Sequence, residues 1–347
     1  MTKLLERLIF PIFILALLAV VPSVAEAQGV CNRDPDHPKC QTDPEPDPDP
    51  EPEPDPDPVD PFAWMHPDVG TAHAAGWDGD GSNMITVDNF GGTLYSGSLN
   101  GETYSRTHGD WTFRQSGWVA PGASKSWLDH TAHGAVDIYD AYKDHSGLTA
   151  VNLSFGLFDP AKTDVTADGY SLGKPLWDSI VDQAWAGTAF FAKAAGNTNG
   201  GAVDGTVRMR LNGFRPTNAQ DVLNLSLIGA PGAVFVGALE GDTMASYSTI
   251  AGNNVDVQNM FLVVDVRSDI TNLSGTSFAA PIVTGYAAIL GEKFTDPVTF
   301  AAPTAPAVRD HLLATARTDA ISGYSASIHG MGEACLSCAL APLTPPN

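Results

Sequence analysis

An apolar run without a polar face constrains this chain more than any other feature. Residues 282–290 read Ile-Val-Thr-Gly-Tyr-Ala-Ala-Ile-Leu, and a helix that is apolar nearly all round has to be buried. Pro281 is tolerated only in the first turn of such a helix. The preceding turn therefore places Ser277 where free N–H groups and the helix dipole favour negative charge. A nucleophilic serine would use this position; an N-cap serine before an ordinary core helix is the alternative.

The first part of the chain carries export signals. Residues 1–27 have a basic start, an apolar core at 8–21 and a small-x-small exit before Gln28, which predicts a secretory signal. The apolar core is short for a membrane span. We therefore expect a secreted or periplasmic protein without a stable membrane span after cleavage; a retained anchor is the alternative.

Four cysteines lie near the two ends of the mature chain. Cys31 and Cys40 fall in a short segment at 28–41, and Cys335 and Cys338 lie close to the other end. Export permits disulfides, and we expect local pairing, although four cysteines allow three connectivities. A redox pair or half a metal site is the alternative for Cys335 and Cys338.

Residues 42–61 form an Asp/Glu-Pro segment that cannot bury a core. Nine of the 40 acidic residues lie between 43 and 60, without a basic one. The prolines favour extended polyproline II, so we interpret the segment as a disordered linker; a calcium-binding acidic tail is the alternative. The net charge of −22 argues against nucleic acid as a partner. The folded domain should cover 62–342, followed by a tail at 343–347.

Strands and helices alternate through this domain, which is typical of an α/β fold. Residues 84–87 form a short strand that ends at Asp88, and an acid at the carboxyl end of a strand lies where such sheets place their sites; a turn aspartate is the alternative. We predict further strands at 148–153, 188–194 and 233–239, and helices at 132–144, from Pro175 onward and at 307–316.

Several motifs together resemble the subtilisin-like serine proteases (subtilases, peptidase family S8). Gly-Thr-Ser-Phe-Ala-Ala-Pro at 275–281 matches the family's nucleophile motif, and His108-Gly109 is followed by an Ala-Pro-Gly-Ala turn at 120–123. Asn-x-Ser-x-Gly at 152–156 and Ala-Ala-Gly-Asn at 194–197 are similar to its substrate-binding segments. Asp88, His108 and Ser277 follow the chain order of subtilisin. The resemblance runs from 62 to 342.

This resemblance implies a mostly parallel central sheet with helices on both faces, in three layers. It also implies a secreted serine endopeptidase that cleaves proteins or peptides through an acyl-enzyme, as a monomer and without a catalytic cofactor. The implied catalytic residues are Asp88, His108, Ser277 and the oxyanion donor Asn197. The implied substrate-binding residues are Ser154, Phe155 and Gly156 on one wall of the pocket and Ala194, Ala195 and Gly196 on the other. Structural calcium is common in the family, but no ligand loop is clear enough to name.

Two alternatives remain at the level of sequence. The family's Thr-His-Val after His-Gly is replaced here by Asp-Trp-Thr at 110–112, so a weakly active or inactive binding domain is one. His130 and His133 are rivals of His108, which we prefer because the Ala-Pro-Gly-Ala turn should follow the catalytic histidine. The other alternative is an α/β-hydrolase esterase using Ser171 of Gly-Tyr-Ser-Leu-Gly. The polar residues before Ser171 and the Pro175 after it argue against that.

Overall fold

The computed structural model describes residues 62–159, 172–209, 217–299 and 301–342. All of them belong to one compact unit, Pro58–Asn347. The expected signal segment, the cysteine segment at 28–41, the linker, the tail at 343–347 and Ser171 lie outside the described residues, so those predictions are not tested by the fold.

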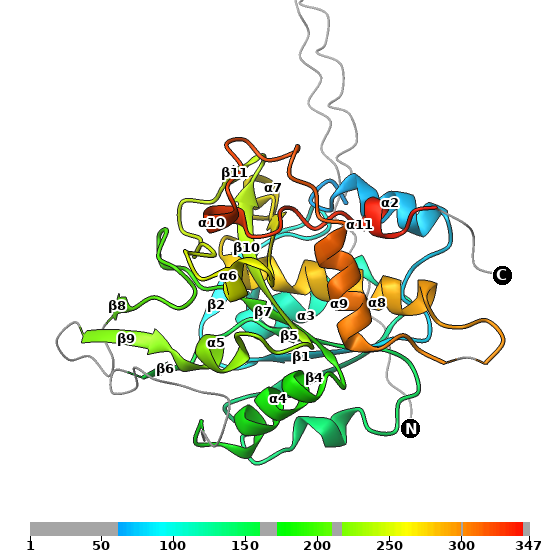
Figure 1. Ribbon diagram of the computed structural model, residues 1–347, viewed down its shortest axis with the longest axis horizontal. Helices are drawn as coiled ribbons and strands as arrows, with labels where there is room; N and C mark the ends of the chain where they lie inside the picture. Colours follow the sequence, from blue (N-terminus) through cyan, green and yellow to red (C-terminus); the bar gives the residue numbers. More distant parts are fainter. Residues whose placement is uncertain (1–61, 160–171, 210–216, 300, 343–347) are drawn as a thin grey trace, which may run out of the picture. The chain divides into compact units, whose positions relative to one another are not determined.

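A parallel sheet organises the described chain (Figure 1). Its strand order is β4-β1-β5-β7-β10-β12, and the short β11 pairs antiparallel with β10. The strands are β1 Asn83–Asp88, β4 Ser124–Asp129, β5 Thr149–Leu153, β7 Phe190–Ala194, β10 Ala233–Glu240, β11 Thr243–Met244 and β12 Phe261–Asp265. The inner strands β1, β5 and β7 are buried along their whole length, and their apolar residues accordingly do not alternate regularly with polar ones.

Helices cover both faces of this sheet, which makes the three layers expected from the sequence. One core packs α8 (Ala280–Lys293), α3 (His108–Val119), α9 (Ala305–Ala314) and α2 (Pro67–Ala74) against one face. The other core packs α4 (Pro175–Ala186), α5 (Val222–Leu227) and α6 (Val255–Gln258) against the opposite face. In Figure 1, α8 and α4 accordingly lie on opposite sides of the strands. Neighbouring residues such as Met84 and Ile85 point into different cores.

Smaller elements complete the unit. Two antiparallel sheets contain β2 Leu94–Gly97 with β3 Tyr104–Thr107, and β6 Phe158–Asp159 with β9 Thr217–Asp221 and β8 Val207–Met209. The short helical turns are η2 Ile138–Ala141, α7 Ser268–Thr271, η3 Thr276–Phe278, α10 Ala326–His329 and α11 Leu336–Ala339. Within the described residues, no helix combines the length and the apolar composition needed to cross a membrane.

The helix predicted for 132–144 is wrong. The carboxylate of Asp129 accepts the backbone N–H groups of Thr131 and Ala132 and closes a turn there. Asp137 then caps only the single 3-10 turn η2 by accepting the Tyr139 N–H. Aspartates that bond to nearby N–H groups compete with helix formation, so the residues spaced three apart belong to separate turns.

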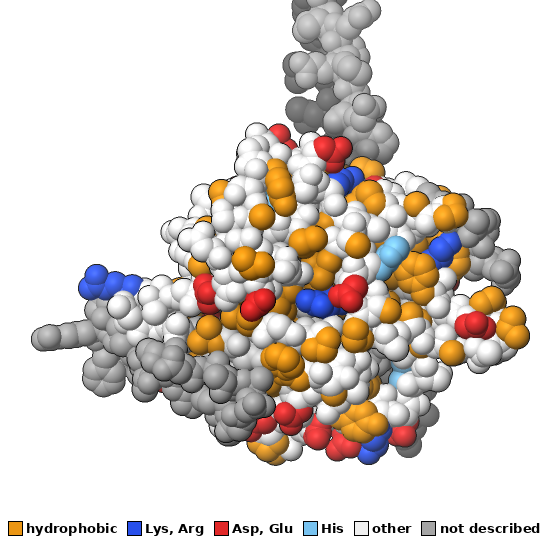
Figure 2. All heavy atoms as spheres, in the orientation of Figure 1, with side chains coloured by type: hydrophobic (Ala, Val, Ile, Leu, Met, Phe, Trp, Pro, Cys, Tyr) orange, Lys and Arg blue, Asp and Glu red, His pale blue; other side chains and the backbone are white. Residues whose placement is uncertain are grey.

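Charged side chains are scattered on the face shown in Figure 2. Acidic and basic groups occur singly or in small groups there, between polar and hydrophobic side chains. The described residues on this face form no continuous basic surface of the kind that binds nucleic acid. The expected lack of a nucleic-acid partner nevertheless stays a prediction.

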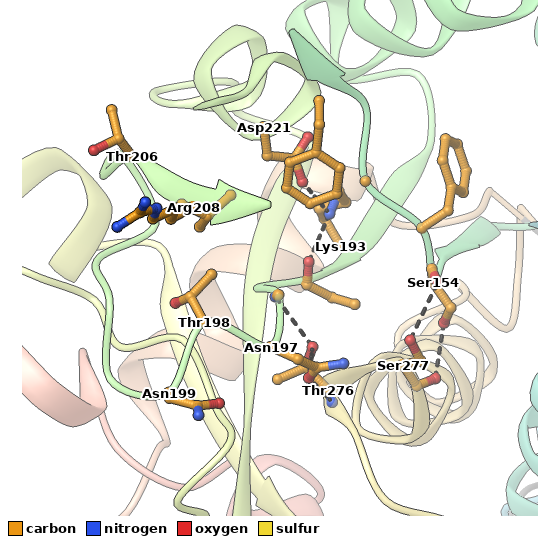
Figure 3. Close-up of a pocket in the computed structure, with 16 residues that line it drawn as sticks. Ser154, Lys193, Asn197, Thr198, Asn199, Thr206, Arg208, Asp221, Thr276 and Ser277 are labelled. Atoms are coloured by element: carbon orange, nitrogen blue, oxygen red, sulfur yellow. Dashed lines mark hydrogen bonds and ion pairs between the residues drawn. The ribbon is translucent and has the colours of Figure 1, made fainter. Parts of the chain in front are cut away.

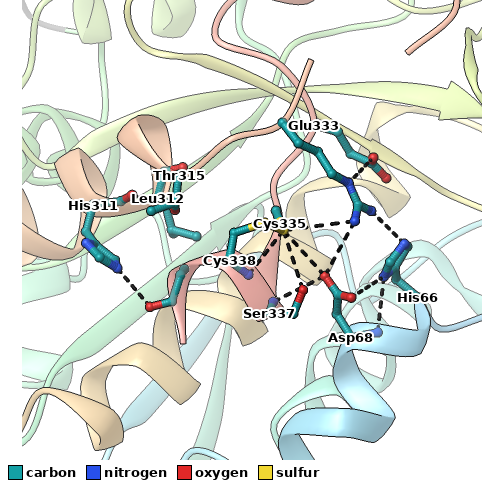
Figure 4. The surroundings of a disulfide bond; sticks show 11 residues. His66, Asp68, His311, Leu312, Thr315, Glu333, Cys335, Ser337 and Cys338 are labelled. Atoms are coloured by element: carbon teal, nitrogen blue, oxygen red, sulfur yellow. Dashed lines mark hydrogen bonds and ion pairs between the residues drawn. A yellow bond between two sulfur atoms is a disulfide. The ribbon is translucent and has the colours of Figure 1, made fainter. Parts of the chain in front are cut away.

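A polar cluster joins α2 to the last turns of the domain (Figure 4). Asp68 accepts the backbone N–H of Ser337 at 3.2 Å and lies 3.3 Å from Nδ1 of His66. Arg317 donates to Glu333 at 2.7 Å and lies 3.9 Å from Asp68. Burial raises the pKa of Asp68, but its hydrogen bonds with His66 and Ser337 outweigh burial and lower the pKa to about 2. A disulfide between Cys335 and Cys338 lies beside this cluster.

We expect Asp68→Asn to lower the free energy of unfolding at pH 7 by about 1 kcal/mol, a value that allows for solvent screening of this half-buried group. Because the folded pKa is below the unfolded one, the stabilisation is present above about pH 4 and is lost as the pH falls toward 2. Urea unfolding at pH 5 and pH 3 should therefore show a smaller difference between variant and wild type at pH 3. Asp310→Asn, at an exposed carboxylate, is the control; an equal effect of both substitutions would contradict the prediction.

Candidate active site

Asp88 and His108 are brought together from two separate elements. Asp88 ends β1, and His108 is the first residue of α3, which Thr107 caps by accepting the Asp110 N–H. The distance between Oδ1 of Asp88 and Nδ1 of His108 is 2.7 Å. If Nδ1–H donates to this carboxylate, Nε2 carries the free lone pair and can accept a proton.

The carboxylate of Asp88 is itself held by further donors. It is 1% exposed, its Oδ2 accepts the Thr112 hydroxyl at 2.8 Å and its Oδ1 accepts the Asn89 N–H at 2.7 Å. A buried carboxylate needs such partners to remain charged. Thr112 belongs to the Asp-Trp-Thr stretch that departs from the family pattern. This departure therefore supplies a hydrogen-bond donor to the aspartate.

Gly109 is required by the close approach of α3 to the end of β1. Its N–H donates to the Asn89 carbonyl at 2.9 Å. A Cβ at this position would lie 2.8 Å from the Phe90 ring and 2.9 Å from the Asn89 carbonyl oxygen, closer than packed atoms tolerate. The glycine therefore allows His108 to reach Asp88.

The two rival histidines do not bond to Asp88 through their side chains. The ring of His130 stacks on Phe155 with centroids 4.4 Å apart, and burial lowers the pKa of His130. Nδ1 of His133 accepts the Asp129 N–H at 3.0 Å. Of the three histidines, the structure thus pairs His108 with the aspartate.

Ser277 lies in the turn η3, which leads into α8. Its hydroxyl donates to the carbonyl of Ser154 at 3.2 Å, and the Ser154 hydroxyl donates to the carbonyl of Ser277 at 2.8 Å. Ser277 and His108 line one cavity of about 480 Å³ with Tyr95 and Phe278, but no hydrogen bond joins them in the described residues. Catalytic hydrogen bonds often form only in the complex with substrate, so this geometry alone does not exclude the pair.

The amide of Asn197 has its orientation fixed by Thr276. Oδ1 of Asn197 accepts the Thr276 N–H at 2.9 Å and the Thr276 hydroxyl at 3.2 Å. That hydroxyl in turn accepts the Gly196 N–H at 3.0 Å. Because the oxygen is engaged, the NH₂ group is left as a donor. Gly275 approaches it with φ +129, and a Cβ there would lie 3.2 Å from Nδ2.

A second cavity, of about 570 Å³, opens beside Ser277 and Asn197 (Figure 3). Five of the six predicted substrate-binding residues line it: Ser154, Phe155, Gly156, Ala194 and Gly196. Ala195, which follows β7, does not line it, since it is 1% exposed and packs in the core on the face of the sheet that α4 covers. The cavity also contains a buried ion pair, with Lys193 Nζ 3.3 Å from Asp221 Oδ2.

Sequence reasoning missed four residues of this site. Thr112 and Thr276 act through hydrogen bonds to Asp88 and Asn197, and no local pattern reveals such partners. The sequence could have identified Lys193, because it is the charged residue in the apolar strand Phe-Phe-Ala-Lys-Ala. No sequence pattern identifies Asp221, because its role depends on packing against β7. The described residues contain no group of three or more His, Cys, Asp or Glu side chains arranged to hold a metal ion, and structural calcium stays an untested expectation.

Comparisons with known proteins agree with this architecture. The model of the subtilase family, Peptidase S8, matches residues 119–332, a range that contains Asn197 and Ser277 but begins after Asp88 and His108. No curated protein matches the chain. Among solved structures, the prenylagaramide maturation protease PagA is 17% identical with a TM-score of 0.50, covering 80% of this chain and 99% of its own. The epidermin leader peptide processing serine protease EpiP from Staphylococcus aureus is 13% identical with a TM-score of 0.50, covering 80% of each chain. At these identities the likeness shows the fold.

Two glycines of α3 should respond oppositely to alanine. Gly109→Ala places a methyl group against backbone and the Phe90 ring, and we expect a loss of about 1–3 kcal/mol in the free energy of unfolding. Gly117→Ala meets only the flexible Lys125 side chain, and we expect a gain of up to about 1 kcal/mol from helix propensity. Urea unfolding of both variants tests this; a Gly109→Ala variant as stable as wild type would contradict the close approach.

Proposed function

The chain belongs to the subtilase family, and from this we propose that it is a secreted serine endopeptidase. The observation that carries the proposal is the 2.7 Å contact between Asp88 and His108 beside a cavity that Ser277 and Asn197 also line. Residues 1–27, with their signal-like pattern, support action outside the cytoplasm. Cleavage of protein or peptide substrates, by a monomer, is part of the proposal.

In the proposed reaction, the hydroxyl of Ser277 attacks the carbonyl carbon of the scissile bond while Nε2 of His108 takes its proton. Asp88 holds the imidazole in the required tautomer and stabilises its charged form. His108 then gives the proton to the leaving amine, the C–N bond breaks and an acyl-enzyme remains. Water, activated by the same histidine, hydrolyses the ester and restores Ser277.

Charge develops on the carbonyl oxygen during both steps. The NH₂ group of Asn197 and the backbone N–H of Ser277 are the proposed donors for this oxyanion, and they are fixed before substrate arrives. Thr276 is a positioning residue, because it holds the amide oxygen of Asn197. An extended substrate would pair by strand addition with the segment 154–156.

Before attack, the Ser277 hydroxyl has to leave the Ser154 carbonyl. A rotation about its Cα–Cβ bond would redirect the hydroxyl toward the cavity shared with His108. The existing bond to Ser154 favours the second candidate function, a subtilisin-like binding domain with weak or no activity. Serine-directed reagents separate the two functions.

A fluorophosphonate probe should label wild-type protein at Ser277, because only an activated serine reacts with it. Mass spectrometry of the labelled peptide locates the site. Ser277→Ala should abolish both labelling and casein digestion. Ser274→Ala, in the same turn, is the control: loss of labelling in this variant would show that the probe reacts with Ser274 instead. A folded wild-type protein that neither reacts nor cleaves casein would support the binding domain, and labelling of Ser171 would support the esterase.

Asn197→Ala should lower kcat by about 10²–10³-fold with little change in KM, the loss observed when subtilisin is deprived of one oxyanion donor. Thr276→Val removes the hydroxyl but leaves its N–H on Asn197, so we expect a smaller fall of about tenfold in kcat. Asn253→Ala, at an exposed asparagine, is the matched control and should behave as wild type. Equal activity of Asn197→Ala and this control would remove Asn197 from the mechanism.

A further inference from the structure

The cavity beside Ser277 contains a fully buried cation. Lys193 is 1% exposed, and its neighbours Phe191 and Ala192 on β7 are wholly buried. Burial lowers the pKa of Lys193, while the charge of Asp221 opposes that shift. A buried charge is costly unless it is paired, so a lysine at this position calls for an explanation beyond core packing.

Asp221 is better supplied with hydrogen bonds than Lys193. Its Oδ1 accepts backbone N–H groups from Leu157 at 2.9 Å, Leu223 at 3.2 Å and Asn224 at 3.4 Å. Its Oδ2 accepts from Lys193. Both oxygens of this carboxylate therefore accept hydrogen bonds from the protein itself, and the charge needs no ligand to stabilise it.

The ammonium group, in contrast, has donor capacity left over. It has three N–H groups, and in the described part of the chain it donates to the carbonyl of Ala194 at 2.6 Å and to Asp221 at 3.3 Å. The third N–H has no acceptor there. Lys193 lines the cavity, so a side chain that fills the cavity as far as this wall would meet the ammonium group.

The remaining lining strengthens the preference for a negative group. Arg208 on β8 is exposed and lines the same cavity, and it forms no ion pair with any described residue. With Lys193, Asp221 and Arg208, the cavity has one more positive than negative charge. Figure 3 shows Arg208 and Lys193 on the part of the cavity away from Ser277. A basic ligand would add a third cation here, and an apolar one would cover the ion pair without bonding to it.

We infer that this cavity selects an acidic side chain, so that the enzyme cleaves after glutamate and, less efficiently, after aspartate. The inference rests on the proposed protease function and specifies its substrate class. Phe155 and the small residues at 194–196 would by themselves suggest a pocket that tolerates apolar side chains, and the inference replaces that interpretation. Glutamate is preferred because its extra methylene carries the carboxylate farther from the scissile bond toward Lys193.

The test uses the full chain and peptides that differ only in the residue before the scissile bond: Glu, Asp, Gln, Leu, Phe or Lys. We expect kcat/KM for Glu to exceed that for Gln and Leu by about ten- to hundredfold, the range for a charge-assisted hydrogen bond. A higher kcat/KM for Leu, Phe or Lys than for Glu overturns the inference. If peptides are cleaved and Ser277 is labelled, the protease function survives that result; if neither occurs, the function fails and the inference fails with it.

Variants test whether the preference for glutamate depends on the ion pair between Lys193 and Asp221. Lys193→Met/Asp221→Asn removes both charges together, so no buried charge is left unpaired, and asparagine retains the N-cap of α5. We expect the Glu/Leu ratio of kcat/KM to fall by about ten- to hundredfold, with thermal unfolding confirming a folded variant. Arg208→Gln, at the exposed rim, should lower the ratio about two- to fivefold and serves as the test if the double variant does not fold.

Lys125→Gln is the matched control, because it removes the same charge from the amino-terminal end of β4, outside both cavities. It should keep the wild-type ratio. An unchanged Glu/Leu ratio in both pocket variants would show that the ion pair has only a structural role and would overturn the assignment to Lys193 and Arg208.

Discussion

The burial of α8 is the constraint on which the rest of the described structure depends. Twelve of its fourteen residues are buried, from Ala280 to Gly291, and an apolar helix of this kind gains stability only when every side is removed from water. The sheet supplies one side through β5 and β7, and α3 and α9 supply others. Because α8 is fixed by this packing, the turn before it holds Ser277 at a defined place beside the carboxyl end of β5.

The polar groups proposed for catalysis are held by hydrogen bonds within this apolar surrounding. Asp88 is held by Thr112, Asn89 and His108, and Asn197 is held by Thr276. Such networks cost free energy unless they are satisfied, and when satisfied they hold side chains in a single orientation. Asp88, His108 and Asn197 are therefore positioned before a substrate binds. The proposed acidic specificity would use the ammonium N–H of Lys193 that has no acceptor among the described residues.

Sequence reasoning predicted correctly the strands at 84–87 and 188–194 and the helix from Pro175, which correspond to β1, β7 and α4. The strands at 148–153 and 233–239 and the helix at 307–316 correspond to β5, β10 and α9 within a few residues. The helix at 132–144 failed because aspartate side chains bond to nearby N–H groups there, a local competition that apolar spacing does not show. For the site, motif resemblance named Asp88, His108, Asn197 and Ser277. The last three line one cavity and Asp88 bonds to His108 behind it. The resemblance did not reveal Thr112, Thr276 or Asp221.

The sequence by itself determined that a buried helix follows Ser277, that strands and helices alternate, and that the motifs occur in the order Asp, His, Ser. These properties depend on residue types at short spacing, which periodicity and motif comparison read directly. Only the tertiary structure decided which groups meet. Ser154 and Ser277 are 123 residues apart yet bond to each other, and Lys193 pairs with Asp221 across 28 residues. Such partners follow from the sheet order β4-β1-β5-β7-β10-β12, which brings together segments that no local pattern connects.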